Sequence, residues 1–379
     1  MAASLPRFGQ RENEGAALSD SDYYLDMAEV FAGEAERFDA RYSAPGHPGA
    51  HHYGRPLLPW LAAGLDPLLP GGARAAFSLL NLLAAWAAAL ALTFHLSQAV
   101  PGLRHPWVPG ALFLTGFPQV NWGYHLLTDT FGLATALVAC LCAAALLRWH
   151  ARERPLPLDA RVVGALAGLF ALQALAFLTR ETAWIGVVAV AGLVASGVLG
   201  RTPRRPSLDL RFGAAVVAVL LAAKLPHALY MARFGLEGVP FAFAPAVWLD
   251  PGYGLDFLLK SAVAFHLAWP LALLGLRRGG LARVPPVLVA WAGAGLLYMA
   301  AGYAHNSLAG IGYPLRLTWA LFPLVYALAW RWLEDAAPGR RLLGAALLAV
   351  AVNLAVGVAG TRLDEGRSGV TVPGMLDRG

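Results

Sequence analysis

Charged residues are scarce in this chain. Asp, Glu, Lys and Arg together make up 14% of its 379 residues, whereas hydrophobic residues make up 58%. Soluble globular proteins carry about 25% charged residues on average. The shortage of charge therefore excludes a soluble protein of this size and predicts an integral membrane protein.

Two other features are also missing. The polar–apolar alternation of transmembrane strands is absent and Ala, Leu and Gly dominate, so we predict an all-α fold. Cysteine is limited to Cys140 and Cys142. Because positions two apart on a helix point in different directions, these cysteines cannot pair with each other, and we expect both to be packing residues.

Long apolar runs are the main positive signal, and they predict a polytopic protein of about ten transmembrane helices. The second run is too short to span a bilayer comfortably, so a broken segment is expected there. The runs are Phe77–Gln98, Trp107–Val120, Phe131–Leu147, Val162–Leu178, Ala183–Leu199, Phe212–Met231, Leu258–Leu276, Pro285–Gly302, Leu317–Leu333 and Leu342–Gly360.

Arginines gather in alternate loops between these runs. Loops rich in Lys and Arg stay on the cytoplasmic side, so the pattern defines the cytoplasmic face and accounts for the net charge of +6. A nucleic-acid partner is not indicated, because the arginines are spread over five short loops without interleaved aromatic residues. They are Arg104; Arg148, Arg152, Arg154 and Arg161; Arg201, Arg204, Arg205 and Arg211; Arg277, Arg278 and Arg283; and Arg331, Arg340 and Arg341.

The same alternation divides the chain into three parts. Residues 1–75 are expected to form an extracytoplasmic N-terminal segment, residues 76–360 the transmembrane domain, and residues 361–379 an extracytoplasmic tail. No signal peptide precedes the polar N-terminal segment, so we predict that the natural protein has a further apolar helix upstream. In the opposite topology, residues 1–75 would stay in the cytoplasm and all five arginine-rich loops would face outward, against the charge bias.

The other polar residues fall on the outer side, and the first cluster is acidic. An apolar 3.6-residue period follows residues 19–22, which predicts an amphipathic helix at the outer face. Ser19 or Asp20 would cap this helix, and acids in its first turn suit the helix dipole. Alternatively, Asp20 or Asp22 serves as a general base or a metal ligand.

His52 and Arg55 form the next cluster, just before the apolar stretch Leu57–Leu61. That stretch predicts a short interfacial helix anchored by Trp60. His51 and His52 are adjacent and lack zinc-ligand spacing, so they make a weak metal site. Arg55 either extends along apolar surface to the interface or binds a phosphate.

Three charged residues mark the following outer turns. Asp129 begins the third helix, where a carboxylate ordinarily caps the first turn. Arg180 and Glu181 occupy a tight turn between two apolar runs. An arginine costs about 2.5 to 3.5 kcal/mol at the centre of a membrane helix and less near the interface, so Arg180 needs a partner or an aqueous cavity. Either Glu181 is that partner, or both residues line a substrate chamber.

The last polar positions lie in the second half of the chain. Lys224 and His227 are inside an apolar run, and they are functional-site candidates unless Lys224 simply extends to the interface. His305, Tyr313 and Arg316 precede a late apolar helix. The Arg316 position suits binding of an outward-facing anionic headgroup.

In their order along the chain, these features resemble the multi-spanning GT-C glycosyltransferases, which use a polyprenyl-phosphate-linked sugar at the outer face of the membrane. The resemblance covers most of the chain, and the order of the short motifs carries it. The matching segments are Asp20-Ser21-Asp22-Tyr23-Tyr24 with the helix after it, Tyr53-Gly54-Arg55-Pro56-Leu57-Leu58-Pro59, Thr128-Asp129, Leu178-Thr179-Arg180-Glu181-Thr182, and Arg316 with Pro323.

The resemblance implies a GT-C-like fold in the cytoplasmic membrane and an inverting sugar transfer to an acceptor of unspecified identity. Asp22 or Asp20 would be the general base, which contributes about 10²- to 10⁴-fold. In that family the first outer loop follows a membrane helix, in agreement with the helix expected upstream. No residue spacing requires a metal, although a divalent ion could do part of the work. The candidate substrate-binding residues are His52, Asp129, Glu181 and Tyr313, with Arg55, Arg180, Lys224 and Arg316 for the phosphate and His227 or His305 as hydrogen-bond donors.

Two other classes of protein compete with this interpretation. A transporter or lipid flippase would place ionisable residues midway through the membrane or in its cytoplasmic half, and transporters often contain internal repeats. The sequence shows neither feature. A noncatalytic membrane scaffold would use the outer polar residues only as ion pairs and helix caps.

Overall fold

The computed structural model describes residues 20–36, 38, 50–100, 102–116, 119–120, 128–153, 159–198, 209–236, 258, 261–262, 264–306, 318–337, 339 and 341–364. All regular elements with defined bounds in these residues are helices, which confirms the predicted all-α fold. They are α1 (Asp20–Ala32), η2 (Ala50–Gly54), α3 (Leu57–Leu65), η3 (Asp66–Leu68), α4 (Gly72–Ala99), α5 (Val108–Thr115), α7 (Asp129–Glu153), α8 (Ala160–Thr179), α9 (Ala183–Ser196), α10 (Leu210–Ala222), α11 (Leu225–Phe234), α13 (Ala268–Arg277), η5 (Gly280–Arg283), α14 (Pro286–Asn306), η6 (Thr318–Leu321), α16 (Phe322–Ala336) and α17 (Arg341–Asp364).

Five helical segments in the described part of the chain are long and apolar enough to cross a membrane. Each coincides with a predicted apolar run, and they cover Gly72–Ala99, Asp129–Arg152, Ala160–Thr179, Leu210–Phe234 and Arg341–Ala359. Two of them are capped at their N-terminus by an aspartate. The side chains of Asp159 and Asp209 accept backbone N–H groups from the first turns of α8 and α10.

Other predicted segments are shorter or broken. The run at 107–120 yields α5, only 8 residues long, so the expected break there is confirmed. The run Phe212–Met231 was expected to be one helix, but it divides into α10 and α11 at a turn before Pro226. The run Leu258–Leu276 is likewise interrupted, because His266 has a φ of 33° and α13 begins only at Ala268. The last two breaks could not be predicted from composition, because the residues on both sides of each break are apolar.

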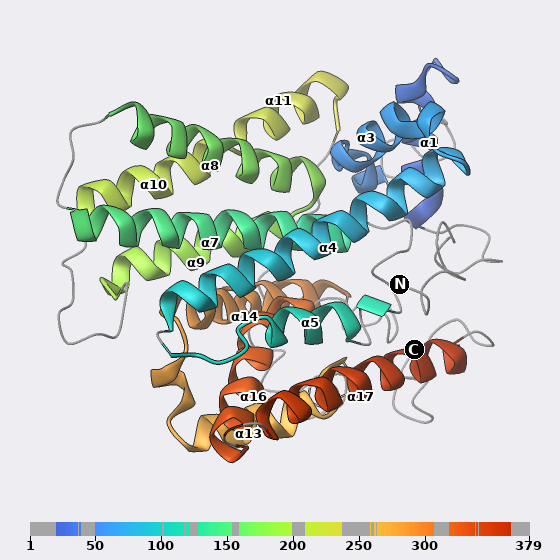
Figure 1. Ribbon diagram of the computed structural model, residues 1–379. Coiled ribbons are helices and arrows are strands. Elements are labelled where there is room, and N and C mark those ends of the chain that lie inside the picture. Colours follow the sequence, from blue (N-terminus) through green and yellow to red (C-terminus); the bar gives the residue numbers. More distant parts are fainter. Residues whose placement is uncertain are drawn as a thin grey trace.

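The helices pack in two groups around α7 and α16. Helix α7 lies against α4, α8 and α9, whereas α16 lies against α13 and α5, and α17 covers α5 (Figure 1). Small residues let these helices approach closely. A Cβ at Gly275 of α13 would lie 2.8 Å from the Leu328 carbonyl oxygen of α16. Contacts between α9 and α14 join the two groups.

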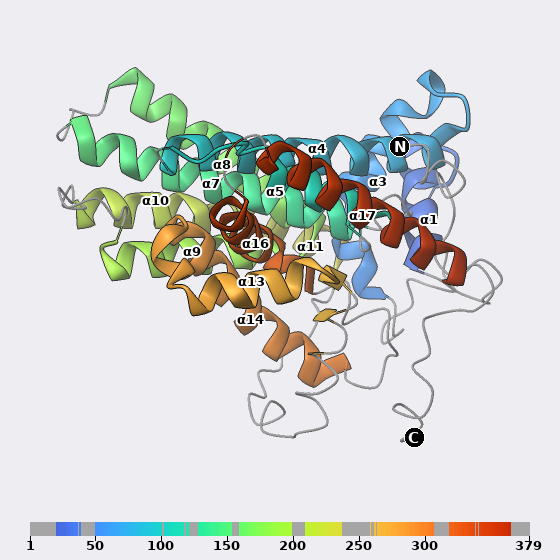
Figure 2. The same cartoon turned by 60° about the horizontal axis from the view of Figure 1, so that its bottom comes forward.

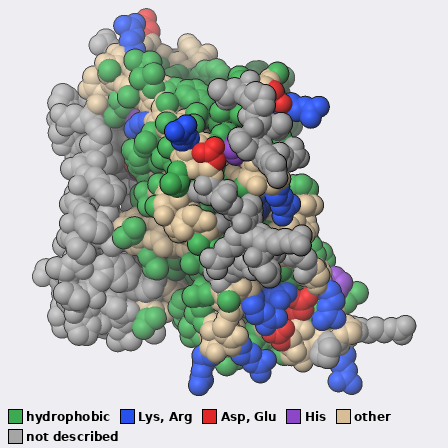
Figure 3. Space-filling view, turned by 90° about the vertical axis from the view of Figure 1, so that its left-hand side faces the viewer, with side chains coloured by type: hydrophobic (Ala, Val, Ile, Leu, Met, Phe, Trp, Pro, Cys, Tyr) green, Lys and Arg blue, Asp and Glu red, His purple; other side chains and the backbone are tan. Residues whose placement is uncertain are grey.

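Arginine-rich segments meet at one end of this bundle. Glu334 forms ion pairs with Arg104 and Arg331, and Arg283 pairs with Asp335. Three of the five predicted arginine-rich loops therefore lie together. Figure 3 looks onto the left-hand side of Figure 1, and Lys, Arg and acidic side chains gather at its lower edge.

The N-terminal elements occupy the opposite end. Helices α1 and α3 pack on each other and on α4, beside its first turns, in both ribbon views (Figures 1 and 2). Their shared core contains Tyr24, Met27, Tyr53, Leu58 and Phe77. The predicted interfacial helix is present as α3, and Trp60 on it is 58% exposed. This small core sets the position of the segment that carries Arg55.

Candidate functional site

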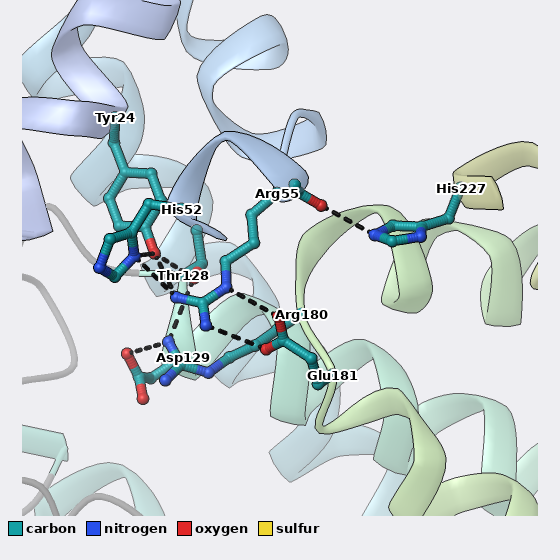
Figure 4. A network of polar contacts seen from close by, with 9 residues as sticks. Tyr24, His52, Arg55, Thr128, Asp129, Arg180, Glu181 and His227 are labelled. Atoms are coloured by element: carbon teal, nitrogen blue, oxygen red, sulfur yellow. Dashed lines mark hydrogen bonds and ion pairs between the residues drawn. The ribbon is translucent and has the colours of Figure 1, made fainter. Parts of the chain in front are cut away.

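Polar side chains from five separate parts of the chain meet at this end. They come from α1, from the segment joining η2 to α3, from the start of α7, from the turn between α8 and α9, and from α11. Figure 4 shows Tyr24, His52 and Glu181 around the guanidinium group of Arg55, with Asp129 against Arg180 and His227 against the backbone beside Arg55. The following contacts define the site network, which consists of Tyr24, His52, Arg55, Thr128, Asp129, Arg180, Glu181, Lys224 and His227.

Arg55 lies at the centre of the network. Its Nε and Nη2 donate to the two carboxylate oxygens of Glu181 at 3.3 and 3.0 Å, which is a bidentate pairing. Its Nη1 donates to the Tyr24 hydroxyl at 2.8 Å and to His52 Nδ1 at 3.0 Å. The residue is only 4% exposed, so it does not extend to water, and the interfacial alternative for Arg55 is wrong.

The backbone before Arg55 is held from two sides. On the α1 side, the Tyr53 hydroxyl donates to Asp26 at 2.5 Å, and the ring of Tyr23 stacks on that of His52. On the α11 side, Tyr230 donates its hydroxyl to the Tyr53 carbonyl at 3.0 Å. These contacts fix the direction in which the Arg55 side chain leaves the chain.

Lys224 and His227 act together at the break between α10 and α11. His227 Nε2 lies 2.8 Å from the Gly54 carbonyl oxygen, and because a carbonyl only accepts, Nε2 carries the hydrogen. Nδ1 of the same ring then accepts from Lys224 Nζ at 2.8 Å. Lys224 Nζ also lies 5.2 Å from the centre of the Phe177 ring. Both nitrogens of His227 thus have partners, and His227 holds the backbone beside Arg55.

A second ion pair lies deeper. Arg180 Nη1 donates to Asp129 Oδ2 at 2.7 Å and to Thr128 Oγ1 at 3.3 Å. Thr128 Oγ1 is 3.1 Å from the Tyr24 hydroxyl, which links this pair to Arg55. Gly132 makes room for the pair, because a Cβ there would lie 2.8 Å from the Cβ of Arg180.

The alternative in which Glu181 is the partner of Arg180 is wrong. The partner of Arg180 is Asp129, 51 positions earlier, rather than Glu181 next to it. Glu181 pairs with Arg55, 126 positions away. The ordinary interpretation of Asp129 as the first residue of a helix is correct but incomplete, since its carboxylate also neutralises a buried arginine.

The electrostatics keep the Arg55–Glu181 pair ionised. Burial alone would raise the pKa of the Glu181 carboxyl, but the positive charges of Arg55 and Arg180 outweigh it and lower that pKa to about 2. Burial alone would lower the pKa of Arg55, but Glu181 and Tyr24 outweigh it and raise that pKa above its ordinary value. At neutral pH Arg55 and Glu181 therefore form an ion pair.

Seven of the predicted substrate-binding residues belong to the network: His52, Arg55, Asp129, Arg180, Glu181, Lys224 and His227. Asp22 is half-buried on α1, two residues before Tyr24. The side chains of Asp20 and His305, and Tyr313 and Arg316 altogether, lie outside the described residues. Cys140 and Cys142 are free, as expected, but only Cys140 is buried.

Sequence reasoning missed Tyr24, Thr128 and Asp26 as members or supports of the site. Tyr24 contacts Arg55, His52 and Thr128, so it joins three segments. The signals in the sequence were the tyrosine pair directly after Asp22 and the motif Thr128-Asp129. Within the described residues, no three His, Cys, Asp or Glu side chains are grouped so that they could hold a metal ion.

A solved structure is similar in fold to this chain. ArnT from Cupriavidus metallidurans in the apo state matches with a TM-score of 0.52 and 17% sequence identity, over 95% of this chain and 73% of the ArnT chain. No protein-family model and no curated protein sequence matches the chain. At this level of identity the likeness concerns the fold. The protein thus shares the fold of ArnT over 95% of its length.

Proposed function

We propose that the protein is a membrane glycosyltransferase that moves a sugar from a polyprenyl-phosphate donor to an acceptor hydroxyl. One observation carries the proposal: a buried arginine, Arg55, directs its guanidinium fork at a single carboxylate, with Arg180 and Lys224 close by, at one end of an ArnT-like helical bundle. Such a fork matches the geometry of a phosphate.

The proposed reaction is a single displacement with inversion. Asp22 or Asp20 takes the proton from the acceptor hydroxyl, and the acceptor oxygen forms a bond to the anomeric carbon of the sugar. The bond between that carbon and the phosphate oxygen breaks, and the electron pair leaves with the lipid phosphate. Arg55 stabilises the developing negative charge on that phosphate, supported by Arg180 and Lys224.

The place of the reaction follows from the charge pattern. The arginine-rich end, with Arg104, Arg283 and Arg331, would face the cytoplasm, and the site network would then lie at the outer face of the cytoplasmic membrane. Membrane lipids surround the helices in this proposal, and the lipid part of the donor lies among them.

The decisive experiment uses the full chain in proteoliposomes with a polyprenyl-phosphate-linked sugar and an acceptor extract. A variant with both Asp20→Asn and Asp22→Asn is expected to lose at least about 100-fold in transfer rate, measured as released polyprenyl phosphate. Glu29→Gln is the matched control, because Glu29 is an exposed carboxylate on the same helix. Unchanged transfer in the double variant would contradict the proposed general base.

The same vesicles separate an enzyme from a transporter or flippase. An enzyme changes the covalent state of the labelled sugar, whereas a transporter or flippase moves donor across the bilayer with its sugar–phosphate bond intact. Donor that crosses the membrane uncleaved, with no labelled product, would replace this proposal by the transporter alternative.

A further inference from the structure

The carboxylate of Glu181 occupies the part of Arg55 that would bind a phosphate. Nε and Nη2 of Arg55 both donate to Glu181, while Nη1 donates to Tyr24 and His52. All three nitrogens of the guanidinium group are therefore engaged within the protein. An anion that binds this fork has to displace Glu181.

Of the groups around Arg55, Glu181 is the one free to leave. Its side chain is 30% exposed, compared with 5% for Arg55. Tyr24 is fully buried and also contacts Thr128, and His52 is buried under the ring of Tyr23. Glu181 lies in the short turn between α8 and α9, and its carboxylate is its main attachment to the rest of the network.

A further basic side chain, Lys224, is connected to the Arg55 segment through His227. Lys224 Nζ donates to His227 Nδ1 at 2.8 Å rather than to a carboxylate, and His227 in turn contacts the carbonyl of Gly54, the residue directly before Arg55. Movement of Glu181 from Arg55 toward Lys224 would give its carboxylate another basic partner.

We infer that Glu181 is an internal substitute for the donor phosphate: the phosphate displaces its carboxylate from the Arg55 fork, and Glu181 moves toward Lys224. This inference rests on the proposed function. It makes Glu181 a residue that sets donor affinity. After transfer, return of Glu181 to Arg55 helps to expel the lipid phosphate product.

Two substitutions of Glu181 distinguish displacement from simple repulsion between Glu181 and the phosphate. Glu181→Gln removes the negative charge, so either effect predicts tighter phosphate binding. Glu181→Asp keeps the charge but shortens the side chain by one methylene, which withdraws the carboxylate from Arg55. Displacement predicts tighter binding in both variants, whereas repulsion alone predicts tighter binding only in Glu181→Gln.

The measurement is the binding of undecaprenyl phosphate to the full chain in nanodiscs. Displacement predicts that the dissociation constant falls about three- to tenfold in both variants, because one charge-assisted interaction no longer competes. Glu334→Gln is the control. Glu334 is a buried carboxylate paired with Arg331 at the arginine-rich end of the bundle, so its substitution should leave binding of undecaprenyl phosphate unchanged.

The outcomes separate this inference from the proposed function. Binding by the wild type with an unchanged or weaker dissociation constant in Glu181→Asp overturns the displacement and leaves the enzymatic proposal standing. Failure of the wild type to bind undecaprenyl phosphate overturns the proposed donor and the inference with it. If Glu181→Gln does not fold, Glu181→Asp alone decides, because it retains the charge that Arg55 needs.

Discussion

Arg180 and Asp129 form a buried ion pair, with Arg180 Nη1 2.7 Å from Asp129 Oδ2 and side-chain exposures of 2% and 8%. The pair joins the turn after α8 to the start of α7. It lies beneath Arg55 and connects to it through Thr128 and Tyr24. Two hydroxyl groups therefore connect this buried pair to the guanidinium group of Arg55.

Loss of one partner of this pair should be costly. We expect Asp129→Asn and Arg180→Ala each to lower the free energy of unfolding by about 3 to 5 kcal/mol, because each leaves a buried charge uncompensated. Arg283→Ala is the comparison, since the Arg283–Asp335 pair is 36% and 28% exposed. Its removal should cost at most about 1 kcal/mol. Denaturant titration of detergent-solubilised protein measures the free energy of unfolding of each variant. Equal losses from the two pairs would show that burial does not make the Arg180–Asp129 pair more stabilising than the exposed one.

The close approach at Gly132 gives a second prediction. A Cβ at this position would lie 2.8 Å from the Arg180 Cβ and 3.3 Å from Thr182 Oγ1. Gly132→Ala should therefore displace Arg180 from Asp129 and reduce both stability and transfer activity. At Gly168 on α8 nothing lies within 4 Å of a built Cβ, so Gly168→Ala should be neutral or stabilising by up to about 1 kcal/mol. A thermal-unfolding comparison of the two variants tests this, and equal behaviour would count against the steric argument.

The helices were predictable because membrane-spanning segments must be apolar over their whole length. The run Phe131–Leu147 falls inside α7, and the run Val162–Leu178 falls inside α8. The breaks at Lys224 and His266 were not predicted, since a change of backbone direction leaves the composition apolar. Pro226 was the one local sign of the first break.

The site was predictable as a set of residues but not as a set of pairs. Charge in or beside an apolar run is costly, so Arg55, Arg180 and Lys224 stood out. Their partners did not, because Glu181 is 126 positions from Arg55 and Asp129 is 51 positions from Arg180. Neutral Tyr24 carries no electrostatic cost near the interface, and its role appears only when the fold brings it against Thr128 and Arg55.

His227 gives a third prediction, on the backbone beside Arg55. Its Nε2 donates to the Gly54 carbonyl at 2.8 Å, so His227→Ala should let the Arg55 segment move and weaken donor binding about fivefold or more, with a smaller change in kcat. His227→Gln retains a donor and should recover part of the loss. KM and kcat measured with a fixed acceptor test this, and a fall in kcat alone would assign His227 to the chemical step instead.

The depressed pKa of Glu181 predicts a specific pH dependence of stability. Burial opposes ionisation of this carboxyl, but Arg55 and Arg180 outweigh it and lower the pKa to about 2, below the unfolded value of about 4.3. A group whose folded pKa is depressed contributes stability above its unfolded pKa and loses it as pH falls toward the folded pKa.

Glu181→Gln should therefore melt at a lower temperature than the wild type at pH 6, and the difference in melting temperature should narrow between about pH 4 and pH 2. Glu29→Gln, at an exposed position on α1, should show no comparable difference at either pH. The melting-temperature difference between wild type and Glu181→Gln could instead stay constant down to pH 3 and below. That result would mean that the shape of Glu181, and not its charge, stabilises the protein. The displacement of Glu181 by a phosphate would then lose its electrostatic basis.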